Sequence, residues 1–121
     1  MNLYQENILE HYHDPLNHGA LSSPTHTHCS LNPTCGDKIC IDLVVVEDVI
    51  ADISFHGEGC AISQAAASML TEHVKGTPIA TLKKLSKDDI LEMLGVELSI
   101  NRLKCGLLAL ETAHKALHKS L

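Results

Sequence analysis

The chain has 121 residues, a formal net charge of −6 and only 9 Lys and Arg residues against 15 Asp and Glu residues. The aromatic content is 2% and there is no tryptophan, so the chain lacks both the cations and the stacking side chains of a nucleic-acid partner. The length fits a single domain over residues 1–121 that is large enough to enclose a hydrophobic core.

The first half of the chain predicts one helix and three strands. A short helix over residues 2–12 ends at His13-Asp14-Pro15, where turn-forming residues follow one another. A short strand is expected over residues 26–31. The clearest strands are 39–46 and 49–56, in which apolar side chains occupy alternate positions.

The pairing of the last two strands depends on the loop between them. A two-residue turn at residues 47–48 would set apolar Leu43 against polar Asp52. A loop with an odd number of residues, centred on Asp48, places Leu43 opposite Ile53 instead. We expect the odd loop, because the buried face fixes the register of a strand pair.

The second half of the chain predicts helices. Apolar residues recur at helical spacing over residues 62–74 and stop at Gly76. Ser86 begins a capped segment that leads into residues 90–94, and a last helix begins at about Asn101. The expected fold class is therefore α+β, with a small antiparallel sheet of about three strands and helices packed on one face.

The cysteines suggest a reducing compartment. The N-terminus shows no signal-peptide pattern and no apolar run reaches the length of a membrane span, so we expect a cytoplasmic protein without a membrane partner. In the cytoplasm, five cysteines are expected to bind metal or react rather than to form disulfides.

Three of the cysteines occupy positions that are typical of reactive or ligating thiols. Cys35 and Cys60 are bracketed by Gly or Pro, and Cys105 lies near the start of the last helix, where the helix dipole would favour a thiolate. If the fold brings them together, Asp37 completes a four-ligand site. Zinc accepts such a tetrahedral set, and a weakly held iron–sulfur cluster is the alternative occupant.

Other interpretations of these residues exist. The three thiols can be unrelated buried side chains that pack as small hydrophobes. Cys40 is expected to pack on the strand face opposite the core, and Cys29 either packs likewise or presents a free thiol.

Two histidine pairs are also candidates for metal binding. His26 and His28 share a strand face, and His114 and His118 are four apart on a helix. Both pairs are better explained as partly solvated polar positions, because the helical pair lacks the glutamate that a metalloprotease needs.

Beyond these patterns, the chain resembles a known family. The segments that carry the resemblance are Asn-Pro-x-Cys-Gly-Asp at 32–37, Gly-x-Gly-Cys-Ala-Ile-Ser at 57–63, Ala-Ser-Met at 67–69, Arg-x-x-Cys at 102–105 and the opening segment 8–19. Together they are similar to the iron–sulfur cluster assembly proteins of the NifU N-terminal, IscU and SufU family. The resemblance covers essentially the whole chain and is specific, because separated motifs occur in the right order.

The resemblance implies a SufE/NifU-like α+β domain that takes persulfide sulfur from a cysteine desulfurase of the SufS, IscS or NifS type. The metal ligands would be Cys35, Asp37, Cys60 and Cys105, with zinc or a [2Fe–2S] cluster or iron as the occupant. Cys35 would accept the sulfur, and Arg102 would support it by holding Asp37 or stabilising freed charge. A downstream scaffold or apo-protein would receive the sulfur or cluster.

The family divides into cluster scaffolds of the IscU type and zinc-binding sulfur relays of the SufU type. IscU-type scaffolds usually have His before the third cysteine, where this chain has Lys104, and Arg102 resembles the SufU pattern. SufU-type chains usually carry an insertion between Cys60 and Cys105, which this chain lacks. We expect the nearest resemblance to be SufU-like. A zinc hydrolase and a zinc-stabilised interaction module are more distant alternatives.

Overall fold

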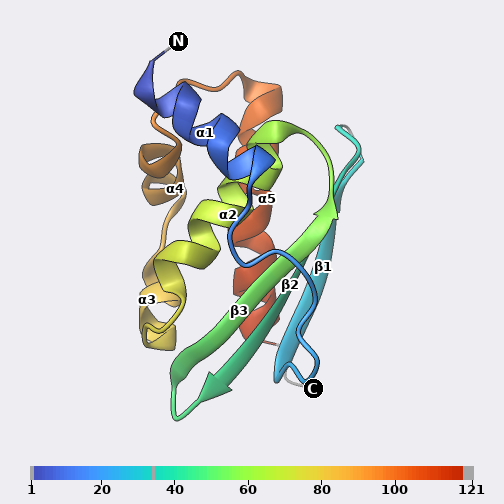
Figure 1. The fold of residues 1–121 in the computed structure, drawn as a ribbon, viewed down its shortest axis with the longest axis vertical. Coiled ribbons are helices and arrows are strands. Elements are labelled where there is room, and N and C mark those ends of the chain that lie inside the picture. Colours follow the sequence, from blue (N-terminus) through green and yellow to red (C-terminus); the bar gives the residue numbers. More distant parts are fainter. Residues whose placement is uncertain (1, 34, 119–121) are drawn as a thin grey trace.

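The computed structural model describes residues 2–33 and 35–118, and it confirms the predicted α+β class. The elements are α1 (Leu3–His13), β1 (His26–Asn32), β2 (Asp37–Val46), β3 (Val49–Glu58), α2 (Ala61–Val74), α3 (Ile79–Lys84), α4 (Lys87–Leu94) and α5 (Ile100–Leu117). The strands form an antiparallel sheet in the order β1-β2-β3. Helices α2 and α5 cover one face of it (Figure 1).

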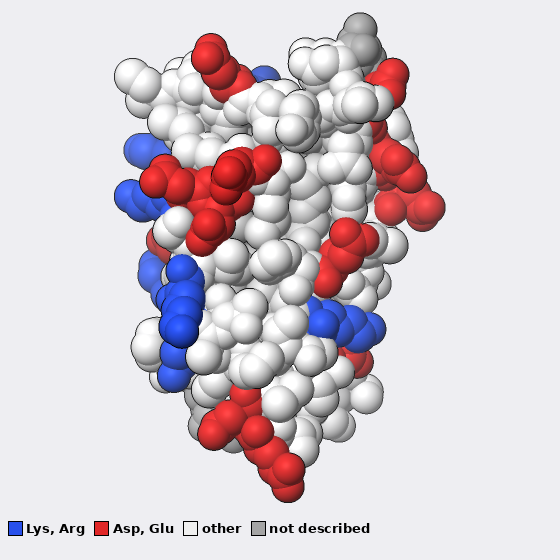
Figure 2. Space-filling view, turned by 90° about the vertical axis from the view of Figure 1, so that its left-hand side faces the viewer, with Lys and Arg blue, Asp and Glu red and all other residues white. Residues whose placement is uncertain are grey.

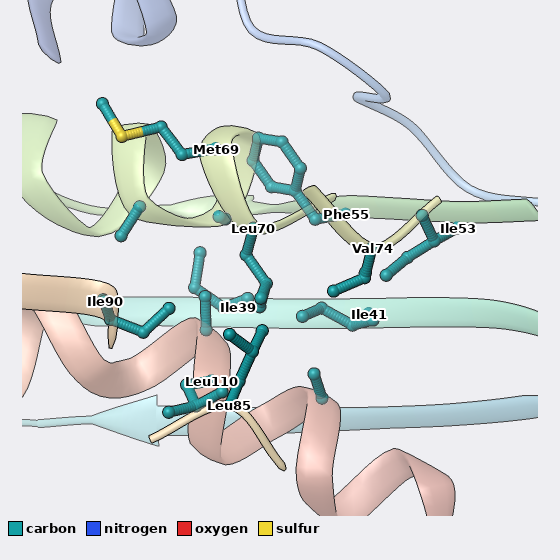
Figure 3. Packing of buried hydrophobic residues seen from close by; sticks show 14 of the residues in the cluster. Ile39, Ile41, Ile53, Phe55, Met69, Leu70, Val74, Leu85, Ile90 and Leu110 are labelled. Atoms are coloured by element: carbon teal, nitrogen blue, oxygen red, sulfur yellow. The ribbon is translucent and has the colours of Figure 1, made fainter. Parts of the chain in front are cut away.

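The core lies between the sheet and these two helices. The inward-facing strand side chains and the helix side chains that meet them are all almost completely buried: Ile39, Ile41, Ile53, Phe55, Leu70, Val74 and Leu110 (Figure 3). Each such burial stabilises the fold by roughly 1.5–3 kcal/mol relative to exposure. Ala65, Ala66 and Ala67 are at most 2% exposed, and their small size lets α2 approach the sheet closely.

The turn between β2 and β3 differs from the expected odd loop, although the expected pairing is confirmed. Glu47 and Asp48 form a two-residue turn with positive φ angles of 51° and 63°, which is typical of tight hairpins. Leu43 still pairs with Ile53, because the register shifts between residues 44 and 45. This β-bulge supplies the extra residue that we had assigned to the loop.

The helices begin and end where the sequence predicts, with one addition. Ser86 caps α4 through a capping box with Asp89, and Gly76 follows the end of α2 with a φ of 81°. The short helix α3 (Ile79–Lys84) was not predicted, since six residues are too few for a helical pattern to stand out.

Cys29 and Cys40 form a disulfide, so the expectation that the cysteines form none is wrong for this pair. The two residues are direct partners in the β1–β2 ladder, with a Cα–Cα distance of 4.0 Å. Cys40 is 3% exposed and lies on the sheet face opposite the core, as predicted. Cys29 is exposed, but its sulfur is bonded rather than free.

The surface over α1, α3 and α4 carries acidic side chains in separate groups beside a column of basic ones (Figure 2). Within residues 2–33 and 35–118, every helix is too short or too polar to cross a bilayer.

Candidate metal and sulfur site

The predicted ligands come from three separate parts of the chain that meet at one end of the sheet (Figure 1). Cys35 lies in the connection between β1 and β2, and Asp37 is the first residue of β2. Cys60 follows β3 directly and is the N-cap of α2. Cys105 lies in the second turn of α5.

The structure brings three of the four predicted side chains into one group and places the fourth beside it. One ligand atom from each of Cys35, Asp37 and Cys105 lies within 4.8 Å of the others, and Cys60 is not a member of that group. The Cys60 Sγ is 3.9 Å from Asp37 Oδ2, and the Cys60 backbone N–H donates to Asp37 Oδ1 at 2.8 Å. Ligand atoms of a tetrahedral zinc ion with bonds of about 2.3 Å stand about 3.8 Å apart, so the Cys60–Asp37 separation fits such an ion.

Asp37 is a buried carboxylate that lacks a protein cation beside it. It is only 1% exposed, and the ion pairs among residues 2–33 and 35–118 are Lys75–Asp52 and Lys115–Glu111. A buried charge without an opposite charge is costly. A bound metal cation would remove that cost, so the donor set fits a metal.

Gly59 makes room for Asp37. Its φ is +148°, and a Cβ built on it would overlap Asp37 Oδ1. Both the backbone angle and the close approach therefore favour glycine immediately before Cys60.

Cys105 corrects the expectation that all three thiols favour the thiolate. It is fully buried, and burial raises its pKa, with hydrogen bonds to Cys35, Asp37 and Cys60 adding to the rise. The dipole of α5 does not offset this rise, because dipole effects fade beyond the first turn of a helix. Cys105 therefore needs a cation beside it before it can ligate as a thiolate.

The other two thiols are more accessible. Cys35 and Cys60 are half-buried and free of disulfides. Cys60 stands at the N-terminus of α2, where no side chain caps the first turn. The Cys35 Sγ is 3.9 Å from the carbonyl oxygen of Asn101.

Two asparagines border the site and were not predicted. Asn32 is 7% exposed, and its Nδ2 is 3.9 Å from the Cys105 Sγ. The Asn101 carbonyl is 3.7 Å from the same sulfur. The available signal was that Asn32 is the first residue of the Cys35 motif and that Asn101 directly precedes the Arg-x-x-Cys motif.

The remaining candidates lie outside the four-residue group. Arg102 is exposed and takes part in no ion pair with the described residues, so it does not hold Asp37 here. The His114 Nε2 is 2.8 Å from the Leu82 carbonyl, and the His26 Nδ1 is 2.8 Å from Thr25 Oγ1. Among residues 2–33 and 35–118, the only cluster of three or more His, Cys, Asp or Glu side chains that could hold a metal ion is the one that contains Cys35.

The fold and the site define a small α+β domain whose cysteines and buried aspartate, at one end of the sheet, form a group suited to holding a metal ion. The sequence profile of the NifU-like N terminal domain matches residues 3–120. The chain belongs to this family.

Two curated relatives align with this chain over most of their own length. The zinc-dependent sulfurtransferase SufU of Bacillus subtilis is 34% identical over 134 residues, covering 97% of this chain and 90% of the relative. The iron–sulfur cluster assembly scaffold protein IscU of Aquifex aeolicus is 40% identical over 116 residues, covering 94% of this chain and 73% of the relative.

Solved structures share the fold. A putative iron–sulfur cluster assembly scaffold protein for the SUF system from Fervidobacterium islandicum superposes with a TM-score of 0.79 at 25% identity, covering 93% of this chain and 94% of that one. The N-terminal part of a NifU-like protein from Brucella abortus gives a TM-score of 0.78 at 19% identity, which shows the fold alone.

Proposed function

We propose that this chain is an iron–sulfur cluster assembly protein of the IscU/SufU type that accepts persulfide sulfur at a zinc site. The observation that carries the proposal is the convergence of Cys35, Asp37, Cys60 and Cys105, of which Asp37 and Cys105 are buried without a cation. The family match and the relatives named SufU and IscU support it.

Zinc would be held by those four side chains. When bound, it keeps its thiolates deprotonated and in place. The buried pair, Asp37 and Cys105, would anchor the ion, because both lack access to water. The half-buried pair, Cys35 and Cys60, faces the outside of the site.

Sulfur acceptance follows ordinary thiol chemistry. The Cys35 thiolate attacks the terminal sulfur of a persulfide on a cysteine desulfurase. A bond forms between that sulfur and Cys35 Sγ, the bond to the desulfurase cysteine breaks, and that cysteine leaves as a thiolate. Charge and electrons balance without any further reactant.

Cys35 is the best acceptor for geometric reasons. It lies in the connection between two strands, and Gly36 beside it has a φ of 71°, which allows a turn that presents the thiol outward. Cys105 is buried on α5 and Cys60 is fixed by its hydrogen bond to Asp37.

Exposed apolar side chains next to the site suit a protein partner. Leu31 is 69% exposed beside Asn32, and Ile100 is 81% exposed beside Asn101. Large apolar residues that border a reactive site are typical of contact surfaces. We propose that the desulfurase docks here, and that the same surface later meets the scaffold or apo-protein that receives the sulfur.

A cluster scaffold of the IscU type is the second candidate. The observation in its favour is identity: the IscU relative of Aquifex aeolicus is 40% identical to this chain, whereas the SufU relative is 34% identical. Lys104 and Arg102 favour the SufU-like interpretation.

Metal analysis and a visible spectrum of the purified protein separate the two functions. A zinc relay is colourless with about one zinc per chain, and it forms no cluster with iron and sulfide while zinc stays bound. A brown protein whose cluster passes to an apo-protein would support the scaffold instead.

A reaction with sulfur-labelled cysteine and a purified desulfurase tests which cysteine of this protein accepts the sulfur. After the reaction, mass mapping of blocked peptides should find the added sulfur on Cys35 in the wild type. The Cys35→Ala variant should lose that label, whereas the matched Cys29→Ser variant should keep it. An unlabelled Cys35 in the wild type would overturn the assignment.

A further inference from the structure

The proposed function uses neither Cys29 nor Cys40, although the two form a covalent pair. They face each other in the β1–β2 ladder. Because each is fixed by its own strand, both sulfurs stay within bonding reach after the disulfide is reduced. Cys29 is exposed, whereas Cys40 is 3% exposed.

The pair lies on the sheet face opposite α2 and α5. His56 is the partner of Cys40 on β3, and its Nδ1 is buried without a hydrogen-bond partner. Further along the same face, Asp42 accepts hydrogen bonds from the Thr27 hydroxyl at 2.6 Å and the Leu21 backbone N–H at 3.1 Å. The N-terminal segment thus covers this face at Asp42, while Cys29 stays open to solvent.

We propose that the reduced Cys29–Cys40 pair is a second sulfur site, which takes the terminal sulfur of a protein persulfide and releases it as sulfide. This inference rests on the proposed function for one point only, that persulfide sulfur is delivered to this chain. It adds a reduction step that a plain sulfur relay does not perform.

In the first step, the Cys29 thiolate attacks the terminal sulfur of the incoming persulfide. A new S–S bond forms at Cys29, and the donor cysteine leaves as a thiolate. Exposure assigns this role to Cys29, because the attacking thiol must reach a second protein.

In the second step, the Cys40 thiolate attacks the Cys29 Sγ and expels hydrosulfide. The disulfide closes as the delivered sulfur is reduced from the sulfane state to sulfide, and the two thiols supply both electrons. The His56 Nδ1 stands on the same face to take the Cys40 proton. A dithiol reductant then restores the pair.

Cys35 is not placed to supply this sulfur within the same molecule. The Cys29–Cys40 rung lies three rungs along the ladder from the Asn32–Asp37 rung, which is about 10 Å. Asp37 faces the core side of the sheet, whereas Cys40 faces the other side, because side chains alternate along a strand. The donor is therefore a persulfide on another protein.

The test uses the full-length, zinc-loaded protein with the pair reduced, and limiting glutathione persulfide as the probe. We expect about one equivalent of sulfide per persulfide consumed, with the Cys29–Cys40 disulfide formed in step. The matched control is the same protein with the pair oxidised beforehand, which should release no sulfide by this route.

Two variants assign the steps. Cys40→Ser should keep the added sulfur on residue 29 and release at least about tenfold less sulfide, whereas Cys29→Ser should neither gain sulfur at this site nor release it. Cys29 is exposed, so its variant should fold normally. Sulfide release that is unchanged in Cys29→Ser would overturn the inference. Labelling of Cys35 by the desulfurase, measured in the same variant, tests the proposed function separately.

Discussion

At the scale of single residues, the site depends on two buried groups with opposite needs. Asp37 is a buried acid with no ion-pair partner among residues 2–33 and 35–118, and Cys105 is a buried thiol whose pKa is raised by burial. A metal ion satisfies both at once, because it matches the carboxylate charge and draws the proton from the thiol. The metal-free protein should therefore have a lower free energy of unfolding than the metal-bound protein.

The raised pKa of Cys105 predicts how the metal-free protein responds to pH. The unfolded thiol ionises near 9.0, while the folded thiol keeps its proton to higher pH. Below that value both states are protonated, and above it only the unfolded state gains charge, so the free energy of unfolding falls as pH rises. The slope is at most about 1.4 kcal/mol per pH unit for one group.

Denaturant unfolding in the presence of a chelator, about one unit below and one unit above that pH, measures this slope. Cys105→Ala should flatten it, because alanine does not titrate. A slope that is equally steep in the variant would assign the effect to other groups.

Asp37→Asn should speed metal loss. The amide keeps the shape but removes the charge that balances the ion, and even changes outside the ligand sphere cost about 10–100-fold in affinity. We expect zinc to transfer to a chromogenic chelator at least about tenfold faster than from the wild type. The matched control is Asp42→Asn, a buried aspartate on the same strand that lies away from the site and should leave the rate unchanged.

At the scale of elements, two connections supply half of the site, and β2 and α5 supply the other half. Cys35 lies between β1 and β2, and Cys60 lies between β3 and α2. The sheet and α5 hold these connections at fixed positions. The side chains can then meet without a long loop.

Gly59→Ala tests how tightly the β3–α2 connection fits. Gly19 offers a matched control, because it also has a positive φ, +128°, but a Cβ there would meet nothing within 4 Å. Both variants carry backbone strain, and only Gly59→Ala displaces Asp37. We expect it to lose about 1–3 kcal/mol more unfolding free energy than Gly19→Ala, measured by denaturant titration, and to bind zinc more weakly. Equal losses would show that the contact is unimportant.

Sequence alone predicted the strands, the β2–β3 pairing and the longer helices, because these follow from local patterns. The four candidate ligands came from the family motifs, and their role as ligands stays a prediction. Sequence alone misplaced what depends on tertiary detail. The bulge in the β2–β3 hairpin depends on the geometry of the turn, which the strand pattern does not reveal. The Cys29–Cys40 bond depends on the alignment of β1 with β2, and β1 carries no alternating apolar pattern that would predict it. The expectation that Cys105 favours the thiolate was wrong, because the sequence indicated its position in a helix but not that it is buried.

At the scale of the whole molecule, charged residues and exposed apolar residues lie on different parts of the surface. The net charge is −6, and Figure 2 shows acidic groups spread over the face of α1, α3 and α4. Leu31 and Ile100 are instead exposed apolar residues, and each precedes by one residue an asparagine that borders the site. Recognition of a partner at the site should therefore depend more on apolar contact than on charge.

Leu31→Glu and Ile100→Glu should each raise the KM for this protein in a desulfurase assay by about tenfold, which corresponds to about 1.4 kcal/mol of lost binding. The matched control is Val46→Glu, an exposed apolar residue (54%) at the opposite end of the sheet. Zinc content should be normal in all three. A comparable rise in Val46→Glu would mean that charge alone, rather than the site surface, weakens binding.

Because Cys105 on α5 follows the other three ligands in the chain, the ligand set is incomplete until that helix has been synthesised. An ion captured earlier by a nascent chain would be held by fewer donors. Full retention should appear only after α5 has left the exit tunnel and docked.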